Sequence, residues 1–317
     1  MTAPLVAPSA TAPAALVAAQ SAANRRRAVA LLVALGVVVA VLVALVLVLL
    51  GLGMIGLAVG VALGVAAAFA AHRSAEGLVL RLNRAEPADP LAHARLHNLV
   101  EGLCVAGGLP KPGVYVVDDV APNAFASGRD AKHAAVGVTT GLLELLDRVE
   151  LEAVLAHELS HVRNDDVGVA TVAVTTAGLP TLLADLCVRA AWWDGGRLGR
   201  DDREGGSAPW LGGVGRGLLA LSPVLARPLR AAVGSGREAL ADIAAVDMTR
   251  YPPALVSALE KLEGDTTVVH AGLRSTAHLW MEAPVARTPE EGHLSERNVR
   301  FDAHAPIDQR LDVLREL

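Results

Sequence analysis

The sequence has few cysteines, few aromatic side chains and no surplus of positive charge. Only two of its 317 residues are cysteines, Cys104 and Cys187, and they lie in separate apolar stretches without the spacing of a metal site. We therefore expect no disulfide framework, and a reducing compartment is the easier fit. The formal net charge of -5 gives no reason to expect nucleic acid as a partner.

Aromatic residues make up only 3% of the chain, although hydrophobic residues make up 53%. The apolar content is therefore almost entirely alanine, valine and leucine, and it is high for a soluble globular protein. A chain of this length can hold two domains, or one domain and a membrane-embedded part.

Charge is absent altogether from 44 consecutive residues, 28–71. A single helix of that length would measure about 66 Å, about twice the thickness of the hydrocarbon core of a bilayer. Three glycines within 51–56 mark the middle of the run. We therefore predict two membrane spans, near 29–50 and 54–71, joined by a tight turn. A cleaved signal peptide is the alternative, but its apolar core would be far shorter.

The segment before the first span, residues 1–27, is rich in alanine, proline, serine and threonine up to its closing arginines, and we predict a disordered tail. Those arginines, Arg25–Arg27, precede the first span, and Arg73, Arg81 and Arg84 follow the second. Arginine and lysine are enriched on the cytoplasmic side of membrane spans. We therefore expect both ends of the hairpin, and the domain that follows it, in the cytoplasm.

Residues 72–166 are predicted to form the first part of a globular domain. A helix with its apolar side chains on one face is expected over Leu91–Ala106, ended by a pair of glycines. Three short β-type runs follow, at Gly113–Val117, Asn123–Ala126 and His133–Thr139. We predict a small sheet with Asn123–Ala126 at its edge.

The most informative motif is His157-Glu158-Leu159-Ser160-His161. Asp147, with Glu150 three residues later, resembles the capping box that starts a helix, so the motif is expected on a helix that follows the sheet. Residues four apart lie on one helix face, so both histidines can bind the same ion. Glu158 lies beside them, close enough to take a proton from a metal-bound water.

This is the H-E-x-x-H arrangement of zinc hydrolases. The alternative is a surface helix with two solvated histidines and an incidental glutamate. The surrounding residues are apolar, however, so the helix is expected to be mostly buried. Buried histidines and a buried glutamate need partners, and a metal would satisfy all three.

A catalytic zinc usually has three protein ligands and an open position, so a third ligand is expected downstream. The candidates are Glu238, Asp242, Asp247, Glu260, His270, His278, His293 and His304. Glu238 and Asp242 stand four apart on one face of a predicted helix, so one can bind the metal while the other orients a ligand histidine. An ordinary solvated acidic face is the alternative.

Residues 167–229 hold two further apolar stretches, separated by a glycine-rich charged loop with tryptophans at the inner ends. We predict a second transmembrane hairpin. The alternative is a pair of helices packed against the catalytic domain, because Asp185 and Arg216 are costly in lipid. Residues 230–317 are expected to complete the catalytic domain.

Several motifs in this order resemble the M48 family of membrane-bound zinc metallopeptidases, typified by the bacterial HtpX heat-shock proteases. The resemblance covers nearly everything after residue 25. It rests on the two N-terminal spans, Asn123–Gly128, the H-E-x-x-H motif followed by Arg163–Asp165, a second apolar pair, Arg237-Glu238 with Ala241-Asp242, and a tail element His304-Ala305-Pro306 with Arg310-Leu311.

The resemblance implies His157, His161 and Glu238 as ligands of one Zn²⁺ per chain, Glu158 as general base, and Asp242 and Asn164 as supporting residues around the ligands. It also implies that His304 and Arg310 approach the active site and assist catalysis by binding substrate or the developing oxyanion. The family element has proline where this chain has Ala305. On the sequence alone, His304 is equally a loop histidine and Arg310 a solvated helix residue.

The fold class that follows is a mainly α membrane protein with a small β-sheet, in which a zincin-like metalloprotease domain is interleaved with two transmembrane hairpins. The expected activity is hydrolysis of peptide bonds in misfolded or unassembled membrane proteins at a bacterial inner membrane. Substrate would bind in extended form along the strand formed by Asn123, Ala124, Phe125 and Ala126. A processing peptidase with one substrate, or a non-catalytic membrane scaffold or sensor, are the alternatives. Oligomeric state is not encoded in any motif.

Overall fold

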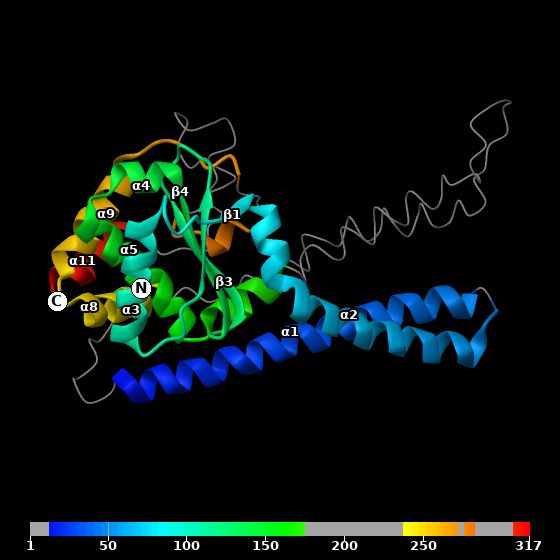
Figure 1. Ribbon diagram of the computed structural model, residues 1–317. Helices are drawn as coiled ribbons and strands as arrows, with labels where there is room; N and C mark the ends of the chain where they lie inside the picture. The colour runs from blue at the N-terminus through cyan, green and yellow to red at the C-terminus, as the bar shows by residue number, and fades with distance from the viewer. Residues whose placement is uncertain (1–12, 50, 175–236, 272–275, 283–306) are drawn as a thin grey trace, which may run out of the picture.

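In the computed structural model, an elongated helical hairpin projects from a body built of helices around a small sheet (Figure 1). The structure describes residues 13–49, 51–174, 237–271, 276–282 and 307–317. The body is assembled from segments far apart in sequence, and the C-terminal residues lie beside the middle of the chain.

The hairpin consists of α1 (Pro13–Leu49) and α2 (Gly53–Leu82). Both helices are long and apolar enough to cross a bilayer, and only 17% and 22% of their most apolar windows are buried in the protein. A core helix of a soluble protein would be mostly buried, so these exposed apolar surfaces suit lipid. The two helices lie where the sequence predicts the first pair of membrane spans.

Close packing of α1 on α2 depends on glycine. A Cβ atom added at Gly64 would lie 2.3 Å from the backbone oxygen of Gly36, and one at Gly60 would lie 2.6 Å from the oxygen of Ala40. With Gly56, these α2 glycines repeat every four residues, which lets two helix backbones approach closely in a membrane.

The N-terminal helix corrects the prediction of a disordered tail for residues 13–27. Helix α1 begins at Pro13, so these residues continue the membrane span as helix rather than coil. The physical reason is that the segment is rich in alanine, the best helix former, and its later residues pack against the body. Helix α2 likewise runs beyond residue 71, and its last turns join the body.

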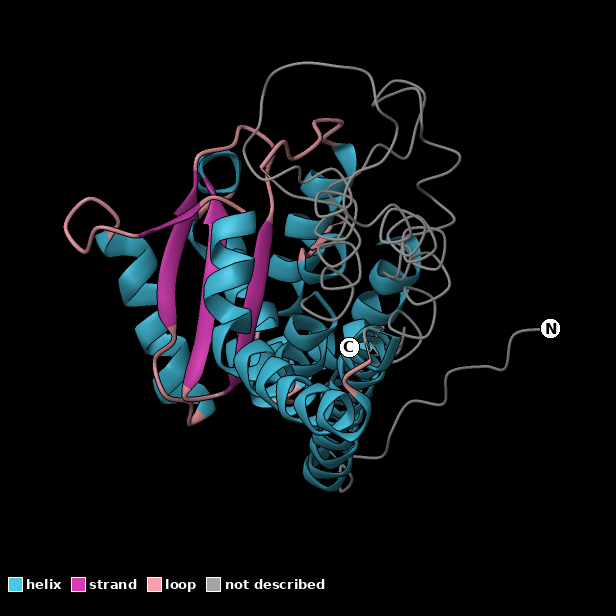
Figure 2. Cartoon of the chain, turned by 90° about the vertical axis from the view of Figure 1, so that its right-hand side faces the viewer, coloured by secondary structure: helices cyan, strands magenta, loops and turns pink. Residues whose placement is uncertain are grey.

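The sheet has four strands in the order β1-β2-β4-β3, namely β1 (Ala85–Pro87), β2 (Gly113–Val117), β4 (His133–Thr139) and β3 (Ala124–Asp130). Strand β2 pairs parallel with β4, and the other two pairs are antiparallel. The expected strands are thus present, with β3 at one end of the strand order. Helices pack on the sheet, and the hairpin extends away from it (Figure 2).

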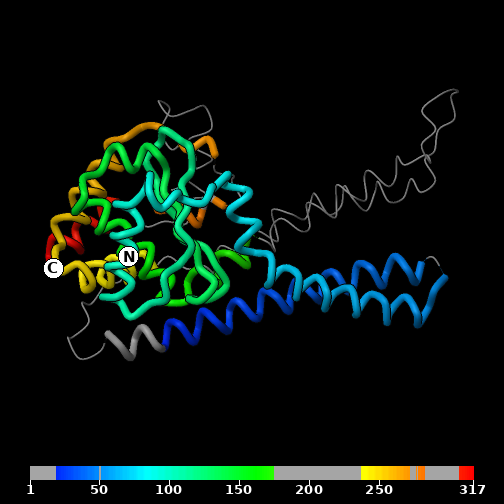
Figure 3. The backbone as a smooth tube through the Cα atoms, in the orientation of Figure 1, coloured from blue at the N-terminus to red at the C-terminus, as the bar shows by residue number. Residues whose placement is uncertain are grey.

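The body is completed by helices whose apolar faces meet in one core. These are α3 (Ala94–Gly107), α4 (Thr140–Leu145), α5 (Arg148–Arg163), α8 (Arg237–Thr249), α9 (Pro252–Gly264) and α11 (Ile307–Arg315), with a short 3-10 helix η1 (Ala277–Leu279). Helix α5 lies at the centre and packs against α3, α8, α9 and β3. The backbone trace shows α8, α9 and α11 gathered on the side away from the hairpin (Figure 3).

The predicted second hairpin, 167–229, lies mostly outside the described residues. Residues 166–174 are helical and bury their side chains, and Val167, Ala170 and Val174 belong to the apolar clusters of the body. The described beginning of this segment therefore packs within the body.

Candidate metal centre

Helix α5 presents the motif from a fixed position in the core. Asp147 accepts hydrogen bonds from the backbone N–H groups of Val149 and Glu150, while the Glu150 side chain accepts from the N–H of Asp147. This is the predicted capping box, and it satisfies the first amides of the helix. Two turns further on, His157 and Glu158 are almost fully buried.

The two motif histidines face each other across a small gap. The Nε2 atoms of His157 and His161 lie 3.2 Å apart, with the rings at a steep angle. Each Nδ1 atom faces a carboxylate instead: His157 Nδ1 lies 2.8 Å from Asp242 Oδ1, and His161 Nδ1 lies 3.1 Å from Asp166 Oδ2. Since a carboxylate accepts, both Nδ1–H groups donate, and both Nε2 atoms are left with lone pairs directed at one point.

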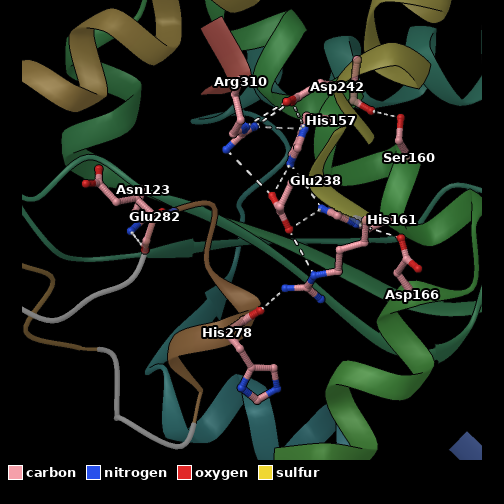
Figure 4. A network of polar contacts seen from close by, with 12 residues as sticks. Asn123, His157, Ser160, His161, Asp166, Glu238, Asp242, His278, Glu282 and Arg310 are labelled. Atoms are coloured by element: carbon pink, nitrogen blue, oxygen red, sulfur yellow. Dashed lines mark hydrogen bonds and ion pairs between the residues drawn. The ribbon is translucent and has the colours of Figure 1, made fainter. Parts of the chain in front are cut away.

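Glu238, from the first turn of α8, supplies the third group. Its Oε2 lies 3.4 Å from His157 Nε2 and its Oε1 lies 3.8 Å from His161 Nε2. Figure 4 shows this carboxylate pointing between the two imidazoles. For a tetrahedral zinc with bonds near 2.0–2.2 Å, neighbouring ligand atoms are roughly 3.3–3.5 Å apart.

The three groups therefore fit a metal ion. One atom from each of His157, His161 and Glu238 lies within 4.8 Å of the others, and all three residues are buried. Two facing imidazole lone pairs beside a buried carboxylate repel one another unless a cation lies between them. The nearby carboxylates also favour a proton on His157. Burial opposes the charged form of His157, but Asp242 and Glu238 outweigh it and raise the pKa of His157 to about 9.

Arg310 reaches the site from α11, but from behind the ligands. Its Nε and Nη2 atoms donate to the two oxygens of Asp242 at 2.8 and 2.7 Å, and only 4% of Arg310 is exposed. Burial alone would raise the pKa of Asp242, but Arg310 and His157 lower it below its ordinary value. The guanidinium of Arg310 thus holds Asp242, and its Nη1 lies 3.8 Å from Glu238 Oε2. The expected role of Arg310 on substrate or oxyanion stays a prediction.

A second arginine, Arg237, contacts the metal ligand next to it. Its Nε lies 3.1 Å from Glu238 Oε1, and its Nη2 donates to the carbonyl oxygen of His278. It thus connects Glu238 to the chain around η1. No spacing rule would have singled out Arg237, because it acts through a neighbouring residue on the helix.

Glu158, the predicted general base, is buried on α5 next to His157. Only 1% of it is exposed, and among the described residues its Oε2 has no hydrogen-bond partner. It lines a cavity with room for about one water molecule, together with His161, Glu238, Arg237 and apolar side chains that include Ala126 and Trp280. Burial raises the pKa of Glu158. A buried, unpartnered carboxyl beside the ligand atoms is suited to accept a proton from water.

The predicted substrate strand is covered by the chain's own residues. Met281 N–H donates to Ala124 O at 2.7 Å, and Trp280 forms a β-bridge with Phe125. The Asn123 side chain accepts from the N–H of Glu282 and donates to its carbonyl oxygen. In this structure the outer edge of β3 is therefore paired with 280–282, and substrate binding by Asn123–Ala126 stays a prediction.

Asn164 and His304 are the remaining predicted site residues. Among the described residues, Asn164 Oδ1 has no hydrogen-bond partner, and the backbone oxygen of Asn164 accepts from Asn24. A supporting role of Asn164 around the ligands stays a prediction. The residue that faces His161 is Asp166, which sequence reasoning missed. Asp165 and Asp166 are adjacent, and only the turn that ends α5, where Asp165 has a φ of 57°, directs Asp166 back to the histidine. His304 lies outside the described residues.

Comparison with known proteins agrees with this geometry. Residues 90–317 match the profile of Peptidase family M48. The chain belongs to peptidase family M48. A "Protease HtpX homolog" from Thermoanaerobacter pseudethanolicus is 38% identical over 247 residues, covering 78% of this chain and 80% of that protein. Another from Tropheryma whipplei is 42% identical over 223 residues, covering 70% of this chain and 72% of that protein.

Membership of this family makes the chain a metalloprotease, and its two apolar N-terminal helices, like its similarity to HtpX homologues, indicate a membrane protein. The family match begins at residue 90, whereas the hairpin precedes it. The predicted resemblance to HtpX-like proteases is confirmed, and the grouping of His157, His161 and Glu238 supplies the residues that could hold the metal.

Proposed function

We propose that the protein is a zinc-dependent endopeptidase of the bacterial inner membrane, with its catalytic body in the cytoplasm, that degrades misfolded or unassembled membrane proteins. The observation that carries the proposal is the convergence of His157, His161 and Glu238 beside Glu158, whose Oε2 has no hydrogen-bond partner among the described residues. Two nitrogens and one carboxylate oxygen are the ligand types of catalytic zinc sites, which leave one position open.

Zinc bound here would supply a Lewis acid that lowers the pKa of water and polarises the scissile carbonyl. Glu158 would accept a proton from the attacking water and then donate it to the leaving amine. Asp242 and Asp166 would hold His157 and His161 in the tautomer that turns Nε2 towards the ligand site. Arg310 holds the Asp242 carboxylate with two hydrogen bonds, and Asn24 donates a hydrogen bond to Asp166.

An extended substrate would pair its backbone with β3. The segment 280–282 makes this kind of pairing with Ala124 and Phe125, which supports β3 as an acceptor of an added strand. A cavity that holds about one water is too small for a peptide, so segment 279–281 would have to move for substrate to enter. Backbone pairing tolerates many sequences, as quality control requires.

The cytoplasmic orientation rests on the arginines that flank the hairpin, Arg25–Arg27 before α1 enters the apolar region and Arg73, Arg81 and Arg84 after it. The beginning of α1 and the end of α2, which carry these arginines, lie beside the body (Figure 1). Substrates exposed at the inner face of the membrane would then be within reach.

The test uses full-length protein in detergent, loaded with zinc and incubated with an unfolded casein-type substrate, beside Glu158→Gln. We expect both to bind one zinc per chain and only the wild type to cleave, with at least a 100-fold difference in rate, on the order expected for loss of a general base. Cleavage by Glu158→Gln at the wild-type rate would overturn the mechanism. Zinc binding without cleavage by either protein would favour a processing peptidase with one defined substrate.

A further inference from the structure

The part of α1 that precedes the membrane span lies along the enzyme body (Figure 1). Its Ala28 and Leu31 pack against Val169 and Ala173, and Arg25 pairs with Asp165 at 3.6 Å. Asn24, next to Arg25 in the helix, is only 3% exposed. A buried amide costs free energy unless its hydrogen bonds are satisfied, so the Asn24 side chain is expected to have hydrogen-bond partners.

Those partners lead directly to a metal ligand. Asn24 Nδ2 donates to Asp166 Oδ1 and, at 3.1 Å, to the backbone oxygen of Asn164. The other oxygen of the same carboxylate, Asp166 Oδ2, lies 3.1 Å from His161 Nδ1. The Asn24 side chain is thus two hydrogen bonds away from the imidazole whose Nε2 faces the ligand site.

The orientation of the Asn24 amide is fixed by its surroundings. Its Oδ1 accepts from Gln20 Nε2 and Arg27 Nη1, both at 3.5 Å, while its Nδ2 faces two acceptors. Oxygen towards donors and nitrogen towards acceptors is the arrangement that satisfies every group. A donor held in this way limits rotation of the Asp166 carboxylate.

Each ligand histidine contacts an aspartate, and each aspartate accepts a hydrogen bond from a residue of a distant helix. His157 is held by Asp242, which Arg310 of α11 fixes with two hydrogen bonds. His161 is held by Asp166, and Asn24 is the donor to that carboxylate from another distant element.

We propose that Asn24 is a positioning residue for the metal ligand His161, acting through Asp166, so that the metal affinity of the enzyme depends on the seating of α1. The inference rests on the proposed metal site and adds a determinant from outside the matched family region, which starts at residue 90. Removal of a partner behind a ligand histidine typically weakens metal binding by about 10–100-fold. We expect about tenfold for Asn24, because it acts one bond further out.

The experiment compares full-length Asn24→Leu, which keeps the side-chain volume without a donor, with Arg25→Ala, which removes a neighbouring contact of α1 with the same turn but leaves Asp166 untouched. Zinc affinity is measured by competition with a chelator. The visible spectrum of the Co²⁺-loaded protein reports the ligand geometry. Thermal unfolding of both metal-free variants reports docking of α1.

We expect Asn24→Leu to bind zinc about tenfold more weakly and to change the Co²⁺ spectrum, while Arg25→Ala matches the wild type in both. Wild-type affinity and spectrum in Asn24→Leu would overturn the inference even if its unfolding temperature fell, because Asn24 would then serve docking alone. Equal losses of affinity in both variants would also overturn it. Failure of the wild type to bind metal would instead refute the proposed function.

Discussion

At the scale of single residues, the centre depends on which nitrogen of each histidine carries the proton. His157 and His161 both direct Nδ1 towards a carboxylate, and this leaves both Nε2 atoms available on the same side. Asp242 can hold His157 only because Arg310 balances its charge in the buried interior. The orientation of the two histidines therefore depends on side chains behind them, Asp242 with Arg310 and Asp166.

Arg310→Lys tests this role. Lysine keeps the charge but cannot form two parallel hydrogen bonds with Asp242, so His157 should be held less firmly. We expect zinc affinity to fall about tenfold, with KM for a peptide substrate unchanged in the zinc-saturated enzyme. Chelator competition and steady-state kinetics measure the two quantities.

Arg315→Lys is the matched control for Arg310, since its partner Glu260 is half exposed on the surface. A raised KM together with wild-type zinc affinity in Arg310→Lys would instead place Arg310 on the substrate.

At the scale of elements, the first turn of α5 is held in place by hydrogen bonds to Glu150. Glu150 closes the capping box and also accepts from Ser257 Oγ and Lys261 Nζ of α9, each at 2.6 Å. Burial opposes its ionisation, but Lys261, Ser257 and the amide of Asp147 outweigh burial and lower the pKa of Glu150. One carboxylate thereby joins the start of α5 to α9.

Glu150→Gln should lower stability by about 1.5–3 kcal/mol near neutral pH, because it removes a charged acceptor. A folded-state pKa below the unfolded value means that Glu150 stabilises the fold above the unfolded pKa of about 4.3. This stabilisation is lost as the pH falls through the folded pKa. The difference in unfolding temperature from wild type should therefore shrink in acid.

Thermal unfolding followed from about pH 8 down to about pH 2 measures that difference as the pH falls below the unfolded pKa of glutamate. Glu260→Gln, which removes an exposed pair with Arg315, should cost only about 0–1 kcal/mol. A Glu150→Gln effect no larger than this control, or one that grows in acid, would contradict the linkage.

The hairpin gives a second prediction at this scale. Gly64→Val should force α1 and α2 apart, because the first added carbon already lies 2.3 Å from Gly36 O. Such overpacking costs about 1–3 kcal/mol. Gly77→Val on the same helix is the control, since a Cβ there meets no atom within 4 Å. Unfolding temperatures in detergent compare them, and equal shifts would show that helix propensity, not packing, is responsible.

At the scale of the whole molecule, the hairpin enters and leaves the apolar region at the same end, where the body is attached (Figure 3). The turn between α1 and α2 lies at the far end. If the hairpin crosses the membrane fully, this turn and the enzyme body lie on opposite faces.

Cysteine labelling tests that arrangement in a protein without Cys104 and Cys187. We expect Met54→Cys, near the turn and 79% exposed, to react with a membrane-impermeant thiol reagent in intact cells. Leu91→Cys, on the body and 89% exposed, should react only after the inner membrane is opened. The reverse pattern would overturn the cytoplasmic placement, and labelling of both in intact cells would exclude a crossing.

Local patterns in the sequence determined the elements and the centre of the site. The capping box, the glycine pair after α3, the uncharged run and the H-E-x-x-H spacing all act over a few residues, so periodicity and chain chemistry were enough to predict them. The metal ligands on α5 were predicted for the same reason, and the resemblance to M48 peptidases supplied Glu238 and Asp242.

Only the tertiary structure decided what surrounds those ligands. Asn24 lies near the N-terminus and reaches His161 through Asp166, whereas Arg310 lies near the C-terminus and reaches His157 through Asp242. No local spacing in the sequence relates either residue to its histidine. The pairing of 280–282 with β3 is equally non-local. Side-chain hydrogen bonds between distant elements depend on how the helices pack, and packing is a property of the whole chain.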